Sequence, residues 1–372
     1  MSKKALWFQT AIFLAFIGIF FILNLVLPDK DFSQNENRKL QAAPQFTLSR
    51  LFEGKFTVEF EEYVTDQFAF RDGWTSLKAR CELLIGKDAN KGIYLCEDER
   101  LIEAFEEPNM EDIDYSLSSI EALAQSSNVP LYFALIPSSA EIYSEFLPTG
   151  APNHSQKELI DYAYSYLTCD TVDMYSTLAA HKDEDIFYRT DHHWTTLGAY
   201  YGYTAVCEAM SIESKPLSGY TRKEVTDSFL GTTFSSSGFR WVRPESIHSY
   251  VEQGEAVITN YPDGAPVEGS LYVESFLEVK DKYAYFYGGN TPLLTIDTGN
   301  EDLPSLLIVR DSYMDSMSPY LMEHFSTIHI VDLRYYRTSL KGYIAANDID
   351  NILVCYSVPN FATDGNIFMI AY

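Results

Sequence analysis

The feature that most constrains the fold is an alternation of short apolar runs with helical patterns near the carboxyl terminus. Apolar runs of strand length occupy residues 305–309, 327–331 and 351–355. Helical patterns fill the two intervals between them, at about residues 314–325 and 339–346. Alternation at this spacing is typical of βαβ units, whose parallel strands form a sheet covered by helices on both faces. The sequence therefore predicts an α/β fold with functional residues just beyond the carboxyl ends of its strands.

Other elements are expected earlier in the chain. Helices are predicted at about residues 110–125, 156–168 and 196–210, and a buried strand in VPLYFALIP. From about residue 225 to residue 300 the pattern changes to short β-type runs (AVITNY, SLYVES, KYAYFYG and LLTI) broken by Gly, Pro and Asn. We predict a β-rich insert there, which either walls a cleft or forms a separate lobe, and we interpret its Gly231 and Asn290 as turn residues.

The amino-terminal segment contains a long apolar run. Between Ala5 and Leu27 the clearly polar residues are one Gln, one Thr and one Asn, and a helix of this length crosses a bilayer core of ~30 Å. Because Lys3 and Lys4 precede the run, the positive-inside rule predicts a cytoplasmic amino terminus and an extracytoplasmic remainder. The run is long for a cleaved signal peptide, so we expect an uncleaved anchor.

These patterns predict three regions. Residues 1–28 form a cytoplasmic stub and a transmembrane anchor. Residues 29–50 are polar, contain Pro44, and are interpreted as a juxtamembrane linker. Residues 51–372 form the extracytoplasmic domain, which includes the β-rich insert.

Charge and cysteine content exclude several classes of protein. The formal net charge of −26 argues against nucleic-acid binding, because phosphates would be repelled. Five cysteines without a paired metal-ligand spacing encode neither a zinc framework nor a disulfide scaffold, although Cys81 and Cys96 could bridge. We expect no metal and no cofactor.

A serine at the end of a predicted strand is the first candidate for chemistry. In SLLIVRDSYMDS, Ser312 follows a buried strand and precedes a helix. A serine hydroxyl is a weak nucleophile at neutral pH and needs a base within hydrogen-bond reach. A turn from strand to helix exposes the hydroxyl and directs free backbone N–H groups of the helix toward any oxyanion formed nearby.

The stretch TDHHW supplies a base and a group that orients it. In extended chain, Asp191 and His193 project to the same side, whereas His192 points away. The carboxylate would hold one imidazole nitrogen while the other accepts the serine proton. Asn360, at the end of the third predicted strand, could donate an amide N–H to the oxyanion.

Each of these residues also has a structural interpretation. Asp-Ser after a strand is a common helix N-cap, and alone it favours capping by roughly four to one. A His-His pair is more often structural than catalytic, and Asp191 with two histidines could be half of a metal site. Trp194 could pack against the following helix, and Asn360 could be a turn residue. From the residues alone, the combination indicates a serine hydrolase or an acyltransferase.

Several motifs in this order resemble those of a known family. TDHHWTTLGAY is similar to the signature of the DHHW proteins, relatives of the alginate O-acetylation proteins, which carry Asp-x-His-Trp and a later serine on an SGNH-hydrolase-like fold. Further similar stretches extend over most of the chain beyond the anchor: ENRKL, EEYVTDQFAFRDGW, SFLGTTFSS, DKYAYFYGGNTP, LLIVRDSYMDS and VDLRYY. The resemblance implies a flavodoxin-like parallel sheet with helices on both faces and a circularly permuted order of motifs.

The resemblance assigns roles residue by residue. Asp191 and His193 match the family's Asp-x-His, and Ser312 matches its serine. Asn360 fits the asparagine of the oxyanion site. DLRYY lacks the glycine of that pattern, so the second oxyanion donor is open, and Arg334 is a candidate on charge. We include Tyr313 and Trp194 among the candidate substrate-binding residues.

The resemblance also implies a function. It suggests a membrane-anchored, extracytoplasmic O-acetyltransferase or acetylesterase that acts on a cell-surface polysaccharide of a bacterium. Because acetyl-CoA is cytoplasmic, a transferase of this kind would need a multi-span membrane acyltransferase partner. Two alternatives stay open. One is a non-catalytic polysaccharide-binding or assembly protein on the same fold, and the other is a metal-dependent hydrolase that uses the two histidines.

Overall fold

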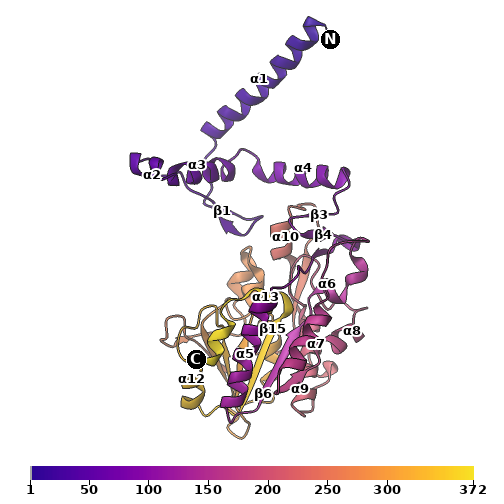
Figure 1. Ribbon diagram of the computed structural model, residues 1–372, viewed down its shortest axis with the longest axis vertical. Helices are drawn as coiled ribbons and strands as arrows, with labels where there is room; N and C mark the ends of the chain where they lie inside the picture. Colours follow the sequence, from indigo (N-terminus) through magenta and orange to yellow (C-terminus); the bar gives the residue numbers. More distant parts are fainter. Residues whose placement is uncertain (1) are drawn as a thin grey trace. The chain divides into compact units, whose positions relative to one another are not determined.

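The chain forms two compact units, which the computed structural model describes for residues 2–372 (Figure 1). The N-terminal unit comprises the residues up to Asn90 together with Phe234–Trp241. The sheet unit comprises Lys91–Thr233 and Val242–Tyr372. The predicted extracytoplasmic domain began at residue 51, whereas the sheet unit begins at Lys91.

The N-terminal unit is mainly helical. Its elements are α1 (Lys3–Val26), β1 (Phe32–Ser33), β2 (Arg38–Lys39), α2 (Leu48–Phe52), α3 (Lys55–Asp66), α4 (Arg71–Leu84), β3 (Ala89–Asn90) and most of α10 (Thr232–Ser237). Helix α1 is long and apolar enough to cross a membrane, by length and composition, and none of its residues is buried. Residues 51–90 belong to this unit, in which Phe68 stacks on Phe20 of α1 with ring centroids 5.6 Å apart.

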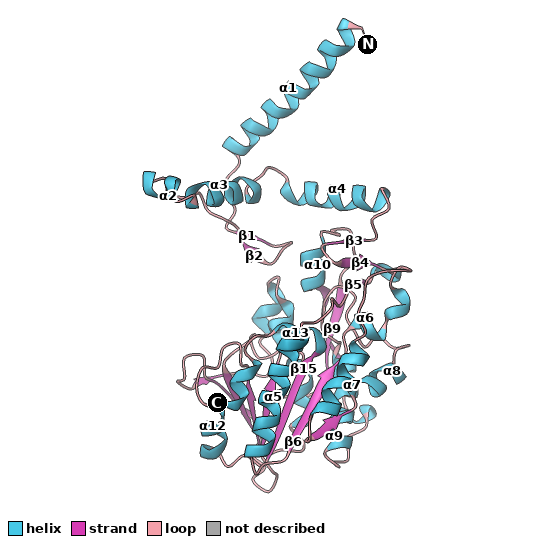
Figure 2. Cartoon of the chain, in the orientation of Figure 1, coloured by secondary structure: helices cyan, strands magenta, loops and turns pink. Residues whose placement is uncertain are grey.

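The sheet unit is built on an eight-stranded mixed sheet (Figure 2). Five neighbouring strands are parallel: β14 (Thr327–Val331), β13 (Leu306–Arg310), β15 (Asn351–Ser357), β6 (Leu131–Ile136) and β7 (Asp170–Val172). Three antiparallel strands extend the sheet beyond β14: β12 (Leu293–Asp297), β10 (Val257–Asn260) and β11 (Val267–Glu268). The four strands β13, β14, β15 and β6 are almost entirely buried, as expected for strands covered on both faces.

Helices cover both faces of this sheet, and each face has its own apolar core. One core contains buried side chains of α8 (Met174–Ala180), α9 (Thr196–Ala209) and α11 (Met314–Leu321). The other contains those of α5 (Met110–Ser126), α7 (Gln156–Tyr166), α12 (Leu340–Ala346) and α13 (Val358–Thr363). Smaller elements are β4 (Ile93–Leu95), β5 (Leu101–Glu103), α6 (Ser139–Ile142), β8 (Lys223–Phe229) and β9 (Glu245–Ser249). The predicted α/β class, the three predicted strands near the carboxyl terminus and the helices at about 110–125, 156–168 and 196–210 are confirmed.

The region from 225 to 300 differs from a single β-rich insert. Strands β10 to β12 continue the central sheet, and β8 pairs with β9 as a separate two-stranded ribbon. The expectation of a strand in KYAYFYG is wrong, because Lys282–Tyr285 forms a 3-10 helix. Aromatic residues favour strands in general, but here Tyr283, Tyr285 and Tyr287 are all buried in tertiary contacts that override this preference.

Candidate active site

Ser312 lies where the central strand β13 ends. β13 pairs in parallel with β14 on one side and with β15 on the other. The chain leaves it at Arg310, turns through Asp311 and Ser312, and enters α11 at Met314. Asp311 is fully buried, whereas Ser312 is half-buried. The carboxyl edge of the parallel strands therefore presents the Ser312 hydroxyl, as the sequence predicted for functional residues.

Asp191, His193 and Ser312 form a continuous chain of hydrogen bonds. The Ser312 Oγ lies 2.7 Å from His193 Nε2, and His193 Nδ1 lies 2.5 Å from Asp191 Oδ1. Asp191 and His193 are 1% and 4% exposed. A hydroxyl bonded to an imidazole that is bonded in turn to a buried carboxylate can transfer its proton to the imidazole when it attacks an electrophile.

Local turns, and not extended chain, bring these side chains together. Residues 189–193 form bends between Phe187 and Trp194, which are joined by an antiparallel bridge. Asp191 Oδ1 accepts a hydrogen bond of 3.0 Å from the backbone N–H of His193, two residues later. Asp311 Oδ1 likewise accepts one of 3.1 Å from Tyr313 N–H. Two Asx-type turns thus fix His193 and Ser312.

The expectation that His192 points away is wrong, because it assumed a strand. The His192 and His193 rings lie with centroids 3.8 Å apart, and His192 Nδ1 is 2.5 Å from Thr232 Oγ1. Thr232 Oγ1 donates to Asp191, so it accepts from His192, whose proton is therefore on Nδ1. Removal from water and the neighbouring His193 lower the pKa of His192 to about 4, although 36% of its side chain is exposed. His192 is thus neutral at pH 7.

The other oxygen of Asp191 is held by a segment that the sequence analysis did not assign to the site. Oδ2 accepts hydrogen bonds from the backbone N–H of Thr232 at 2.6 Å and from its hydroxyl at 2.9 Å. Gly231 precedes Thr232, and a Cβ on it would lie 2.2 Å from Asp191 Oδ2. Gly231 therefore permits a close approach and is not a turn residue. The glycine in SFLGTTFSS was the signal available in the sequence.

These contacts decide the charge of Asp191. Burial raises the pKa of this carboxyl, but the neighbouring imidazoles of His192 and His193 and the hydrogen bonds from His193 and Thr232 outweigh that effect. The pKa of Asp191 is consequently held well below its usual range. A carboxylate that stays ionised can stabilise an imidazolium formed at His193.

The His193 ring also has an aromatic support. It stacks on Tyr283 with centroids 3.8 Å apart and planes 8° apart. The Tyr283 hydroxyl donates to the backbone oxygen of Ser312 at 3.2 Å and to Ser316 Oγ at 3.2 Å. The 3-10 helix that replaces the expected strand therefore fixes His193 relative to the Ser312 loop.

Asn360 and Asp311 connect the ends of two neighbouring strands. Asp311 Oδ2 accepts hydrogen bonds from Ser357 N–H at 2.8 Å, Ser357 Oγ at 2.7 Å and Asn360 Nδ2 at 2.7 Å. One hydrogen of the Asn360 amide is thus directed at Asp311, and the amide carries a second one. The side chain is half-buried.

A buried charge network extends from Arg310. Its guanidinium pairs with Asp315 at 2.9 Å, donates to Asn290 Oδ1 at 2.9 Å and lies 3.8 Å from Asp332. Asp332 also forms a bidentate pair with Arg334, at 2.9 and 2.7 Å, and the Arg334 side chain is 29% exposed. Burial raises the pKa of Asp315 to about 6 against the lowering effect of Arg310. Asn290, interpreted as a turn residue, is thus a partner of this network.

Tyr313 and Trp194 have structural contacts where substrate contacts were expected. Trp194 is 0% exposed, and its indole N–H donates to the Tyr313 carbonyl at 2.9 Å and to Ser316 Oγ at 3.1 Å. Tyr313 is 1% exposed, and its hydroxyl donates to the backbone oxygen of His192. Both side chains tie the Asp191–His193 loop to the Ser312 loop, and both are buried.

The same residues offer the alternative of a metal site. One potential ligand atom each from Asp191, His192 and His193 lies within 4.8 Å of the others. These atoms already have partners, because His193 bonds Asp191 and Ser312 and His192 bonds Thr232. The hydrogen-bond pattern therefore favours the serine-based arrangement.

Comparison with known proteins identifies the family. A family model described as DHHW protein matches residues 114–331, which contain Asp191, His193 and Ser312. Among curated proteins, the probable alginate O-acetylase AlgJ of Pseudomonas syringae pv. tomato is 24% identical over 184 residues, which are 46% of this chain. That match covers 47% of the AlgJ sequence, so the chain spans about half the length of the curated relatives that it matches.

Solved structures share the fold. The crystal structure of a DHHW family protein from Eubacterium siraeum has a TM-score of 0.65 at 24% identity, and the match covers 74% of this chain and 93% of that one. The structure of Bacillus cereus PatB1 with a sulfonyl adduct has a TM-score of 0.61 at 23% identity, covering 74% of this chain and 96% of that one.

Proposed function

Because this chain belongs to the DHHW protein family, we propose that it is a serine-dependent acyl-transfer enzyme on an SGNH-like fold. Its nucleophile is Ser312, its general base is His193, and Asp191 orients and stabilises the base. The substrate is an O-acetylated or acetyl-accepting polysaccharide of the cell surface. The observation that carries this proposal is the hydrogen-bond chain from Ser312 Oγ through His193 to Asp191.

The reaction begins with the Ser312 hydroxyl. Oγ attacks an acetyl carbonyl while its proton passes to His193 Nε2, 2.7 Å away. The resulting imidazolium is stabilised by Asp191, and the tetrahedral intermediate collapses to an acetyl-serine with release of the protonated leaving group. A sugar hydroxyl or water then gives its proton to His193 and accepts the acetyl group.

The oxyanion of the intermediate needs hydrogen-bond donors. The second hydrogen of the Asn360 amide is our first candidate, because the backbone N–H groups of Tyr313, Met314 and Asp315 at the start of α11 already donate to Asp311 and Ser312. Arg334 remains a candidate as well, because its side chain is partly exposed while Asp332 holds its Nε and one terminal nitrogen. We assign Tyr313 and Trp194 the role of supporting the two loops.

The acceptor decides whether the enzyme is a transferase or an esterase. Relatives at this level of identity are named probable alginate O-acetylases, which favours transfer to a polysaccharide hydroxyl. With α1 as a membrane anchor and Lys3 and Lys4 in the cytoplasm, the sheet unit is extracytoplasmic. Acetyl-CoA does not reach that side, so a multi-span membrane acyltransferase would supply the acetyl group.

The proposal is tested with p-nitrophenyl acetate and the full chain in detergent. We expect release of nitrophenol and a transient acetyl mass on the intact protein, both lost in Ser312→Ala and strongly reduced in His193→Ala. Ser155→Ala, at the N-cap of α7, is the matched control and keeps the activity. If the wild type forms no acetyl adduct, transfers no acetyl group and still binds polysaccharide, the non-catalytic alternative replaces this proposal.

A further inference from the structure

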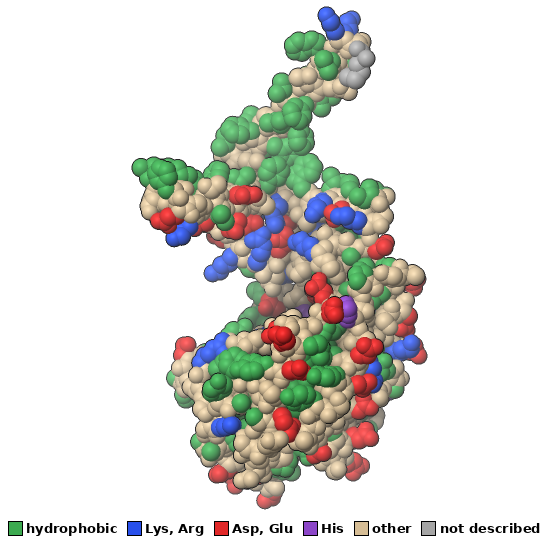
Figure 3. Space-filling view, in the orientation of Figure 1, with side chains coloured by type: hydrophobic (Ala, Val, Ile, Leu, Met, Phe, Trp, Pro, Cys, Tyr) green, Lys and Arg blue, Asp and Glu red, His purple; other side chains and the backbone are tan. Residues whose placement is uncertain are grey.

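The N-terminal unit exposes large apolar side chains along three successive helices. Six of them define what we call the apolar face, with their exposed fractions: Phe52 86%, Phe60 47%, Val64 43%, Trp74 36%, Leu77 49% and Leu84 85%. Figure 3 shows hydrophobic side chains over one side of α2, α3 and α4 and charged side chains on the other. An apolar patch of this extent marks a contact surface.

The spacing of these residues places them on one side of each helix. In α3, Phe60 and Val64 are four residues apart, and the exposed Glu62 lies on the opposite side. In α4, Trp74 and Leu77 are three residues apart and Leu84 follows seven residues later. A helix with apolar and charged sides of this kind is typical of a membrane surface.

The opposite side of α4 is already packed inside the N-terminal unit. Ala79 is 0% exposed, and the Arg80 guanidinium lies 4.0 Å from the centroid of the Trp241 ring. The Asn90 amide donates to the backbone oxygen of Ser237 at 2.7 Å, which ties the end of this region to the same segment. The packing orients α4 with its apolar side outward.

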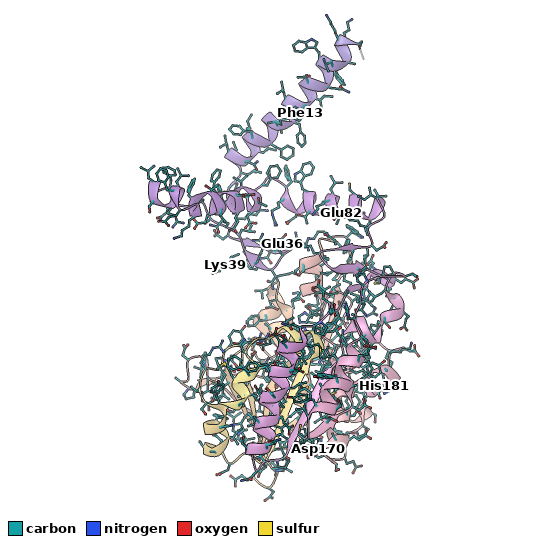
Figure 4. The ribbon with its side chains drawn as sticks, viewed as in Figure 1. Phe13, Glu36, Lys39, Glu82, Asp170 and His181 are labelled. Carbon is teal, nitrogen blue, oxygen red and sulfur yellow. The ribbon has the colours of Figure 1, made fainter. Side chains whose placement is uncertain are left out.

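Helix α1 contacts the junction between α3 and α4. Its Phe16 and Phe20 rings lie 6.1 and 5.4 Å from the Trp74 ring, and its Asn24 accepts a hydrogen bond of 2.7 Å from Ala69 N–H. Phe16 precedes the end of α1 by about 15 Å of helix length. If α1 crosses a bilayer, Trp74 is therefore at the depth of the lipid and not in bulk water. The exposed side chains of α1 itself, such as Phe13, extend this surface (Figure 4).

The distribution of charge agrees with contact to a lipid surface. Residues 1–90 contain 11 basic and 11 acidic residues, so the formal net charge of −26 belongs to residues 91–372. A neutral segment approaches anionic headgroups without the repulsion that an acidic one would meet. Lys78, whose side chain is 66% exposed, flanks the apolar side of α4 and can reach the headgroups.

We propose that α2, α3 and α4 form a collar that lies at the boundary between the headgroups and the acyl chains of the membrane crossed by α1, with the apolar face in contact with lipid. The occupant of this face is the bilayer itself, because α1 leads directly into it and packs against Trp74. The collar fixes the N-terminal unit to the membrane surface through several helices, in addition to the single spanning helix.

The test uses the full chain in vesicles of phosphatidylcholine and phosphatidylglycerol, with an environment-sensitive fluorophore on single cysteines. In a background in which Cys81, Cys96 and Cys169 are serine, the probe is attached at Val64→Cys or, as the matched control on the opposite side of α3, at Glu62→Cys. A probe at Phe13→Cys reports whether α1 is inserted. In a second background, in which only Cys96 and Cys169 are serine, the native Cys81, exposed on α4, is a further reporter of the apolar face.

We expect the probes at residues 64, 81 and 13 to show blue-shifted emission that nitroxide-labelled lipids quench, and the probe at residue 62 to emit as in water. A water-like signal at 64 and 81 beside a quenched probe at 13 overturns the proposal. A blue shift at 64 and 81 without quenching by lipid also overturns it, because another protein chain then covers the face. An unquenched probe at residue 13 would show that α1 is not inserted in the bilayer, and this overturns the premise of the proposal.

Discussion

The two units of the molecule differ in which side chains they expose and which they bury. In the N-terminal unit, Phe52 and Leu84 are 86% and 85% exposed. In the sheet unit, Arg310, Asp311 and Asp332 are 1%, 0% and 0% exposed. Either arrangement costs free energy unless a partner or a function compensates. We infer that the exposed apolar residues serve contact with the membrane and that the buried charged residues serve the reaction at Ser312.

The largest effect on turnover is predicted at Asp191, the buried carboxylate of the proposed triad. Asp191→Asn should lower the rate of p-nitrophenyl acetate turnover by about 10⁴-fold, because an amide no longer holds His193 in the required tautomer. Asp161→Asn, an exposed partner of Lys157 at 2.5 Å, is the control and should stay close to the wild-type rate. If Asp191→Asn lowered the turnover rate by less than about tenfold, Asp191 would not act as the proposed third member of the triad.

Asp311 should show the largest effect on stability. Asp311→Ala leaves the Ser357 N–H, the Ser357 hydroxyl and the Asn360 amide without their acceptor, which we expect to cost roughly 3–5 kcal/mol of unfolding free energy. Urea unfolding measures this value. The exposed Asp98→Ala, which removes a surface pair with Arg243, should cost less than about 1 kcal/mol. Equal losses of unfolding free energy in Asp311→Ala and Asp98→Ala would contradict the difference expected between a buried and an exposed carboxylate.

Buried histidines predict a dependence of stability on pH. Burial lowers the pKa of His329 to about 4, below the ordinary value of 6.5, so between these values the unfolded chain binds the proton and the folded chain does not. The contribution of His329 to the free energy of unfolding is fully present above pH 6.5. It decreases by up to about 3 kcal/mol as the pH falls toward 4. His192 acts in the same direction with a smaller effect, since its side chain is partly exposed.

Urea unfolding at pH 7 and pH 4.5 measures this effect in the wild type and in His329→Phe. The variant should lose less stability on acidification, and the other titrating groups, such as Asp315, cancel in the difference between the two proteins. An identical loss in both proteins would show that His329 is protonated in the folded state.

Substitution of two glycines, one in each unit, should have smaller effects, on turnover in one case and on stability in the other. Gly231→Ala places a Cβ against Asp191 and should lower turnover on the order of 10²-fold by displacing the carboxylate. Gly73→Ala in α4 meets nothing within 4 Å and should stabilise the helix by up to about 1 kcal/mol without changing turnover. Turnover and urea unfolding are measured on both variants. Full activity in Gly231→Ala would contradict the close approach of Gly231 to Asp191 as a requirement for turnover.

The smallest effect is expected on the apolar face. Leu84→Lys should change the unfolding free energy in detergent by less than about 0.5 kcal/mol, because the side chain contacts little protein. Leu321→Ala, at a residue that is 0% exposed in the sheet unit, should cost about 2–5 kcal/mol. A large cost for Leu84→Lys would mean that protein, and not lipid, covers this face.

Much of the fold could be predicted because its signals are local. The runs at 305–309, 327–331 and 351–355 correspond to β13, β14 and β15, since buried parallel strands need unbroken apolar sequence. The segment KYAYFYG could not be assigned in this way. Its tyrosines have strand propensity, but the position of Tyr283 is decided by stacking on His193 and by bonds to the Ser312 loop.

The residues that meet at the candidate site could be predicted from the sequence, but their geometry could not. Asp191, His193 and Ser312 were identified by residue type and by the family's motifs, and the structure brings the three together. The support of Asp191 by Thr232 depends on a contact between residues 41 positions apart, for which no local pattern exists. The position of His192 depends on a turn at Asp191, and the rule for extended chain fails there.

The proposed function depends most on Ser312 being a nucleophile that His193 activates. The most direct measurement is modification of the full chain by phenylmethylsulfonyl fluoride, followed by intact mass and peptide mapping. We expect a single sulfonyl adduct on Ser312 in the wild type, and labelling slowed by orders of magnitude in His193→Ala and Asp191→Asn. No adduct, an adduct on another residue, or equal labelling of Ser312 in the wild type and His193→Ala would contradict the account.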